Sequence, residues 1–186
     1  MGGIMKIYLR PITLEDGPII IKWRNSPNVS KNCFDKRKIT LESNRQFFMN
    51  YVETGKYIQY IVERIDEDFG VSSYPIATVY LKDFDRTNLR CELCIFTSDD
   101  GEWNTESQEI AIRMLLEKAF NDFGLHKVYS FVFADNLAEV ALLEKCGLRI
   151  ECCLHEEAVN ENQEYVDVLR MGIFNKSWCE KEALNN

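Results

Sequence analysis

The sequence lacks several features that mark specialised classes of protein. No apolar run approaches the roughly 18 residues that a membrane helix needs, so we expect no membrane span. Asp and Glu (30) outnumber Lys and Arg (22), and the net charge of −8 argues against a nucleic-acid partner. The N-terminus has no apolar signal core, and no repeat, low-complexity segment or interdomain linker divides the chain. These absences favour an ordinary globular protein.

Disulfide bonds are not expected either. The seven cysteines are an odd number, and several lie inside apolar strand or helix runs, where cysteine behaves as a small hydrophobe. We therefore expect a reducing, cytoplasmic setting. Cys91 and Cys94 form a CxxC pair, but residues three apart on a strand face opposite sides, and the sequence has no second such pair. We therefore predict no metal site.

Length and composition indicate a single domain over residues 1–186. The chain is 46% hydrophobic and 28% charged, which is usual for a domain with a substantial core. Residues 1–5 lead to a second methionine, and we expect them to be disordered or not native to the protein. Residues 175–186 are interpreted as a polar C-terminal tail.

Hydrophobic periodicity predicts an α+β fold, with a mostly antiparallel mixed sheet flanked by about four helices. Thr40 is the expected N-cap of the second helix, and Gly147 is expected to end the fourth. The expected strands cover residues 6–13, 57–65, 76–81, 91–96, 127–134, 148–154 and 164–173. The expected helices cover residues 14–25, 40–53, 109–123 and 137–146.

The central stretch, residues 90–123, combines a strand, an irregular loop and the most strongly periodic helix. The strand is apolar and cysteine-rich, with Glu92 as its only internal charge. A loop that leads into a helix directs unpaired backbone N–H groups at whatever lies above them. Such a place can hold a phosphate group.

Four sequence blocks, taken in order, resemble one known family. They are LRPITLEDGPIIIKWRN, CELCIF, Trp103 with the helix ending in KAF, and Asn136-LAEVALLEKCGL followed by Leu154 and Tyr165-x-Asp167-x-x-x-Met171. Together they resemble the GNAT superfamily of acyl-CoA N-acyltransferases, and within it the RimJ/RimL-like branch. The resemblance covers residues 9–171 and implies the GNAT fold. It also implies an enzyme that transfers the acetyl group of acetyl-CoA to a primary amine by direct attack on the thioester.

The resemblance also implies roles for particular residues. Glu92 matches the branch's strand-four glutamate and is the candidate base, because a partly buried carboxylate has a raised pKa suited to proton transfer. The alternative is a solvent-facing or salt-bridged glutamate. Acetyl-CoA contacts are implied for the strand end, the loop and the fourth helix, at Ile95, Phe96, Thr97, Asn104, Thr105, Glu106, Ser107, Gln108 and Asn136. Acceptor contacts are expected from Trp23, Arg24, Asn25, Phe34 and His155.

Plainer interpretations remain open for several of these residues. Asn136 is equally suited to cap a helix, the aromatic residues are more often part of a core, and His155 is more often structural or on the surface. The tyrosine that protonates the leaving thiolate in many GNAT enzymes is replaced by Leu143, as is frequent in the closer branch. A tyrosine acid at this position is therefore not expected.

The cofactor loop departs from the family pattern. The family usually has glycine at every second position after the tryptophan, whereas this chain has Asn104, Glu106 and Gln108. Residues 99–109 also contain five carboxylates and no Lys or Arg. These departures keep open an alternative, a non-catalytic binding or scaffold protein with a degenerate cofactor loop.

The acceptor also remains open at this point. A small-molecule amine is one alternative, because KWRNSPNV resembles enzymes that acetylate nucleotide-linked amino sugars. A peptide amine is the other, because RimJ and RimL acetylate protein N-termini. A homodimer is a further alternative that the sequence does not decide.

Overall fold

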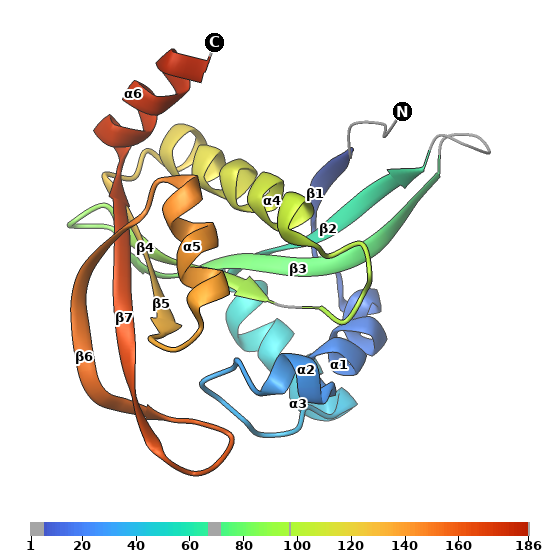
Figure 1. Cartoon of the computed structure of the whole chain (residues 1–186). Coiled ribbons are helices and arrows are strands. Elements are labelled where there is room, and N and C mark those ends of the chain that lie inside the picture. The colour runs from blue at the N-terminus through green and yellow to red at the C-terminus, as the bar shows by residue number, and fades with distance from the viewer. Residues whose placement is uncertain (1–5, 67–71, 97, 186) are drawn as a thin grey trace. The chain divides into compact units, whose positions relative to one another are not determined.

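The computed structural model (Figure 1) describes residues 6–66, 72–96 and 98–185. These residues belong to two compact units. The first unit is Met1–Tyr80 with Ile95–Ile112, and the second is Leu81–Cys94 with Arg113–Asn186. Strands β3 (Ser72–Asp85) and β4 (Arg90–Phe96) each contribute residues to both units. In the part of the chain that is described, no helix is long and apolar enough to cross a membrane.

The strands of the first unit follow the order β1-β2-β3. β1 (Ile7–Pro11) pairs antiparallel with β2 (Ile58–Asp66), and β3 spans Ser72–Asp85. Five consecutive residues of β2, 59–63, are buried, so this strand is covered on both faces. β3 is longer at both ends than the predicted strand, because its polar flanks still pair although they carry no apolar signal.

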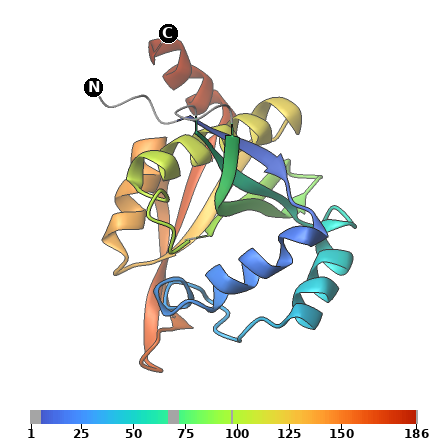
Figure 2. The ribbon, with the colours of Figure 1, turned by 90° about the vertical axis from the view of Figure 1, so that its right-hand side faces the viewer.

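Three α-helices precede β2, namely α1 (Gly17–Asn25), α2 (Pro27–Ser30) and α3 (Leu41–Phe47), and α3 continues as a π-helical turn, Phe48–Val52. α1 and α3 lie side by side (Figure 2). The predicted cap at Thr40 is present, because its hydroxyl accepts a hydrogen bond from the Ser43 N–H. The predicted helix 14–25 instead begins with a 3-10 turn, Leu14–Asp16, in which the Asp16 carboxylate accepts the Thr13 N–H.

The strands of the second unit follow the order β3-β4-β5-β7-β6. They are β4 (Arg90–Phe96), β5 (Lys127–Phe133), β6 (Arg149–Val159) and β7 (Tyr165–Phe174). β7 pairs antiparallel with both β5 and β6, and β6 and β7 form a long hairpin (Figure 1). The predicted mixed, mostly antiparallel sheet is confirmed.

The parallel pair β4–β5 is short. Its register covers Arg90–Glu92 opposite Lys127–Tyr129, whereas β5 continues to pair with β7 as far as Phe133. The backbone of Leu93 and Cys94 therefore lies beyond the parallel register. Strand backbone that is unpaired along one edge, as here toward β5, can accept an extended ligand as an additional strand.

Three further helices follow the central loop, namely α4 (Thr105–Glu117, continued by a π-helical turn, Lys118–Asp122), α5 (Leu137–Cys146) and α6 (Asn175–Asn185). Gly147 has a φ of 108°, in the left-handed region, and closes α5 as predicted. The residues predicted to form a polar tail are helical instead. Their anchor is Trp178, which is buried with its ring centroid 6.1 Å from that of Phe120.

Candidate active site

The loop before α4 caps its own helix. The Asn104 side-chain oxygen accepts the N–H groups of Glu106 (3.0 Å) and Ser107 (3.2 Å). The buried Ser107 hydroxyl donates back to the Glu102 carbonyl at 2.7 Å. Asn104 therefore occupies two of the amides that a glycine-rich loop would leave for a phosphate. In the described chain, the N–H groups of Asn104 and Thr105 have no acceptor and remain available.

The loop carboxylates are partly engaged by the first unit itself. Glu102 forms an ion pair with Arg64, and an Asp100 carboxylate oxygen accepts the Glu102 N–H at 2.9 Å. Burial raises the pKa of Asp100, against the opposing effect of Lys22. These two carboxylates are therefore bound within the protein, which reduces the repulsion between them and a phosphate group at this loop.

One buried donor in this loop has no partner. Trp103 is buried, and its indole N–H makes no hydrogen bond to any described residue. A buried unsatisfied donor costs about 1–3 kcal/mol, which an acceptor on a bound ligand would relieve. Together with the two free amides, this donor fits an anionic ligand at residues 103–105.

Other predicted cofactor contacts are placed as follows. Ile95 is half-buried in β4, Phe96 ends that strand, and Thr97 lies outside the described residues. Glu106 is exposed, and the Gln108 side chain donates to the Trp103 carbonyl at 3.0 Å. A role for these residues in binding acetyl-CoA stays a prediction.

Asn136 is the N-cap of α5. Its side-chain oxygen accepts the Glu139 N–H at 3.4 Å, and its amide donates to a Glu139 carboxylate oxygen at 2.7 Å. Burial raises the pKa of Glu139 to about 7. The geometry is therefore that of a helix cap, and a contact of Asn136 with pantetheine remains to be tested.

Glu92 is 6% exposed and is held by two side chains of its own unit. Its Oε1 lies 3.2 Å from the Lys82 ammonium nitrogen and accepts a hydrogen bond from the Cys94 thiol, also at 3.2 Å. Burial raises the pKa of Glu92, and the Lys82 charge offsets part of that rise. Burial alone would lower the pKa of Lys82, but the neighbouring acidic groups raise it overall, so the lysine stays charged.

The hydrogen bond from Cys94 and the ion pair with Lys82 both engage Oε1 of Glu92, and neither engages the second oxygen, Oε2. A carboxylate held at one oxygen and open at the other can take a proton from a water molecule or an amine. The structure thus shows the salt-bridged glutamate of the plainer interpretation, while leaving one oxygen for proton transfer.

Tyr129 lies beside Glu92 in the parallel register. The Arg170 guanidinium carbon is 4.4 Å from the centroid of its ring, and burial, with a contribution from the Glu92 charge, raises the pKa of the phenol. Neither Tyr129 nor Lys82 is among the residues predicted from the sequence. Both lie near Glu92 because of the strand register, and the alternation of apolar residues does not define which residues face each other across strands.

The predicted acceptor residues have different environments. Trp23 is 2% exposed and packs with Ile20 and Ile61 in the core, so it offers no platform for a substrate. The Asn25 side chain bonds both backbone groups of Ile39, at 2.7 and 2.8 Å, and thereby holds the following loop in place.

The other three predicted acceptor residues differ in their exposure to solvent. Phe34 is 47% exposed, and Arg24 is 7% exposed. His155 is largely exposed on β6, in the second unit, with its Nδ1 3.1 Å from Asp167.

Comparison with known proteins identifies the family. The family model of the acetyltransferase (GNAT) domain matches residues 6–149, well over half of the chain. The chain belongs to the GNAT family of acetyltransferases. It is a transferase that uses acetyl-CoA as co-substrate and transfers the acetyl group to an amine. The predicted fold, enzyme class and co-substrate are confirmed, whereas the RimJ/RimL-like branch stays a resemblance.

Solved structures share the fold of this GNAT protein. Spermidine N-acetyltransferase from Vibrio cholerae in complex with CoA and spermine superposes with a TM-score of 0.83 at 23% identity, over 93% of this chain and 98% of that one. A chimera of the Vibrio cholerae enzyme SpeG with hSSAT gives a TM-score of 0.77 at 22% identity, over 94% and 98% of the two chains. Among curated proteins, none matches the sequence.

Proposed function

We propose that the acceptor amine belongs to an anionic small molecule, such as an amino sugar that carries phosphate groups. The observation that supports this acceptor is Arg24. Arg24 is 7% exposed, and its charge acts on the Asp35 carboxylate, which is bound mainly by Arg37. Buried charges in proteins are normally paired, so a guanidinium in this state fits an anion supplied by a ligand.

The charge around Arg24 supports the same acceptor. Residues 22–38 contain six Lys or Arg and one Asp, a net charge of +5, whereas the whole chain carries −8. Within this segment Arg37 holds both carboxylate oxygens of Asp35 and, with a smaller contribution from Arg24, lowers its pKa to about 2. The one acid of the segment is thus neutralised locally. In the family resemblance this segment forms the acceptor wall.

A polyamine acceptor, as in the structural neighbours, is the second candidate. It is a polycation, and each contact with a like charge at about 4 Å costs about 1 kcal/mol in water. The basic segment 22–38 therefore disfavours a polyamine. The neighbours' identity of 22–23% supports the fold and not the choice of acceptor.

Glu92 is the proposed base, acting through a water molecule at Oε2. Lys82 and Cys94 fix the other oxygen, so that the carboxylate is oriented before the substrate arrives. Its raised pKa makes it a better proton acceptor than an ordinary glutamate. Activity should therefore rise with pH through the Glu92 pKa, and Glu92→Gln should remove that limb of the kcat/KM profile.

The acceptor is tested with a panel of amines in a CoA-release assay. The panel contains nucleotide-linked amino sugars, amino sugar phosphates, spermidine and peptides with free N-termini. We expect the phosphorylated amino sugars to have the highest kcat/KM. Higher activity on spermidine or on peptides would reject the proposed acceptor while leaving the acetyltransferase activity itself in place.

The role of Arg24 is tested by Arg24→Gln, with Lys38→Gln as the matched control on an exposed cation of the same segment. Loss of a charged hydrogen bond costs about 1.5–3 kcal/mol, so kcat/KM for the anionic acceptor should fall about 10- to 150-fold in Arg24→Gln. The control should change it little. Equal effects in both variants would mean that only the general charge of the segment matters.

A further inference from the structure

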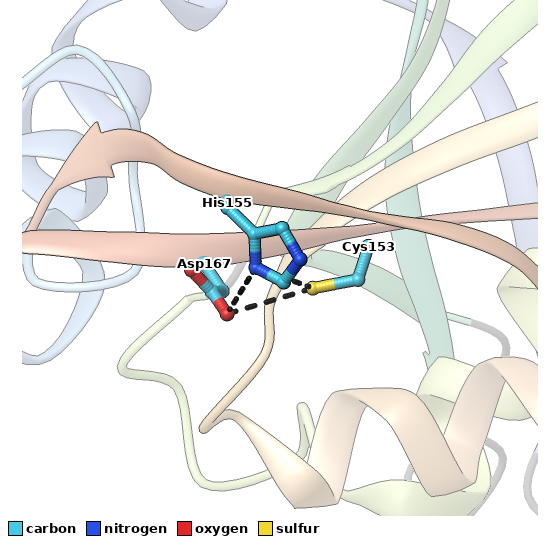
Figure 3. A group of neighbouring side chains, drawn as sticks. All are labelled: Cys153, His155 and Asp167. Atoms are coloured by element: carbon cyan, nitrogen blue, oxygen red, sulfur yellow. Dashed lines mark hydrogen bonds and ion pairs between the residues drawn. The ribbon is translucent and has the colours of Figure 1, made fainter.

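Three potential metal ligands meet on the hairpin of β6 and β7, in the second unit. Cys153 and His155 are two residues apart on β6, and Asp167 lies on β7 (Figure 3). The Cys153 Sγ lies 3.6 Å from the Asp167 Oδ2 and 4.0 Å from the His155 Nδ1, and the latter two atoms are 3.1 Å apart. One sulfur, one nitrogen and one oxygen therefore face a common point.

We propose that Cys153, His155 and Asp167 bind a divalent transition-metal ion, and that this ion is Zn²⁺. Zinc binds thiolate at about 2.3 Å and imidazole or carboxylate at about 2.0 Å, usually in a tetrahedron. Such a tetrahedron has S–N and S–O edges of about 3.5 Å and an N–O edge of about 3.3 Å. Each separation between the three ligand atoms is within about half an ångström of these edges, so small side-chain rotations complete the site.

The carboxylate is already oriented for this role. The other oxygen of Asp167, Oδ1, accepts the Glu156 N–H at 2.9 Å. Glu156 has a φ of 50° and lies where the β6–β7 register shifts between Leu154 and Ala158. The bulge thus aims a backbone donor at one carboxylate oxygen and leaves Oδ2 for a metal ion, as outer-shell hydrogen bonds do in known metal sites.

Charge and ligand type both favour such an ion. Between Arg149 and Arg170 the hairpin has six Asp or Glu residues and no Lys or Arg. On binding, the Cys153 thiol would release its proton to solvent, and the thiolate and the Asp167 carboxylate would balance the two positive charges of the ion. Sulfur and imidazole ligands select Zn²⁺ over Mg²⁺ or Ca²⁺. A water molecule would occupy the fourth position.

A nucleophilic triad is the other arrangement that these residue types suggest, and the geometry disfavours it. In a triad the nucleophile and the carboxylate contact different nitrogens of the imidazole ring. Here the sulfur and the carboxylate both face Nδ1 (Figure 3). That arrangement suits a shared ion.

The test is a titration of the chelator-treated, full-length protein with Zn²⁺ against a metal indicator, and with Co²⁺ as a spectroscopic probe. We expect one ion per chain, with a thiolate-to-cobalt charge-transfer band and the strong visible bands of four-coordinate cobalt. Cys153→Ser and Asp167→Asn should weaken binding by more than the 10- to 100-fold typical of losing an outer-shell partner. Asparagine keeps an oxygen for the Glu156 N–H, so the bulge is preserved.

Cys152→Ser is the matched control, because Cys152 is the adjacent exposed cysteine and side chains alternate between the faces of a strand. It should keep both the affinity and the cobalt spectrum. The proposal is overturned if the unmodified protein binds no more Zn²⁺ than Cys153→Ser does, or if Cys152→Ser loses the charge-transfer band equally. Circular dichroism of each variant separates loss of the site from loss of the fold.

Discussion

Replacing Lys82 with methionine should make the stability of this acetyltransferase depend on pH through Glu92. The two side chains form an ion pair of 3.2 Å in which the carboxylate is almost fully buried. Methionine removes the positive charge but retains much of the apolar stem. The buried carboxylate would then have no cation at this distance, and its pKa should rise further above the value in the unfolded chain.

The size of the effect follows from the distance. At 3.2 Å, Coulomb's law gives about 1.3 kcal/mol in a medium like water and about 5 kcal/mol at an effective dielectric constant of 20. The pKa of Glu92 should therefore rise by about 1–4 units in the variant. A carboxyl group whose pKa is raised on folding destabilises the folded state as pH climbs from the unfolded pKa to the folded one. The slope is about 1.4 kcal/mol per pH unit.

The assay is urea unfolding of the wild type and of Lys82→Met at pH 5 and at pH 8. At pH 8 the variant should be about 1–5 kcal/mol less stable than the wild type, and at pH 5, where the carboxyl is close to its unfolded pKa, the difference should be much smaller. Lys82→Arg keeps a cation and should behave like the wild type. In the double variant Lys82→Met/Glu92→Gln, the additional pH dependence of stability that Lys82→Met causes should disappear. An equal loss at both pH values, or a loss that persists in the double variant, would refute the electrostatic explanation.

Two further predictions concern the backbone. Leu89 is exposed and has a φ of 50°, a conformation that costs a non-glycine residue about 1–2 kcal/mol. Leu89→Asn should therefore raise Tm by about 2–4 °C, whereas Leu89→Ala, which keeps the strain, should not. Asn104→Gly should cost only a few tenths of a kcal/mol as a cap while freeing the Glu106 and Ser107 amides for phosphate. Acetyl-CoA should then raise Tm more in this variant than in the wild type, and a smaller shift would mean that those amides are not used.

Helix ends were predictable from the sequence where the signal is local. Thr40 and Gly147 were predicted as caps and act as caps, because each depends on one residue type and its neighbours. The start of α4 was predicted too late, at residue 109. The apolar period begins only at Ile110, whereas the cap residue Asn104 precedes it by more than a turn.

The side-chain partners in the site could not be predicted in the same way. Glu92 was identified through the resemblance, but its partner Lys82 comes from a different strand. The Cys153 cluster has no CxxC spacing, so that pattern does not indicate it. A Cys-x-His pair on a strand places both side chains on one face, which is a usable signal, but the approach of Asp167 depends on a bulge.

Positive and negative charges are concentrated in different segments of the chain, and this affects how the binding of a charged acceptor should be interpreted. The net charge of −8 combines a segment of +5 at residues 22–38 with a hairpin, residues 150–169, that carries six carboxylates and no Lys or Arg. A polyamine would be attracted to the hairpin by long-range electrostatics whether or not it is a substrate. An anionic acceptor would be attracted to the basic segment. Spermidine binding or a spermidine-induced rise in Tm would therefore not identify the acceptor, and only CoA release that requires the amine, with its dependence on Arg24, separates the two.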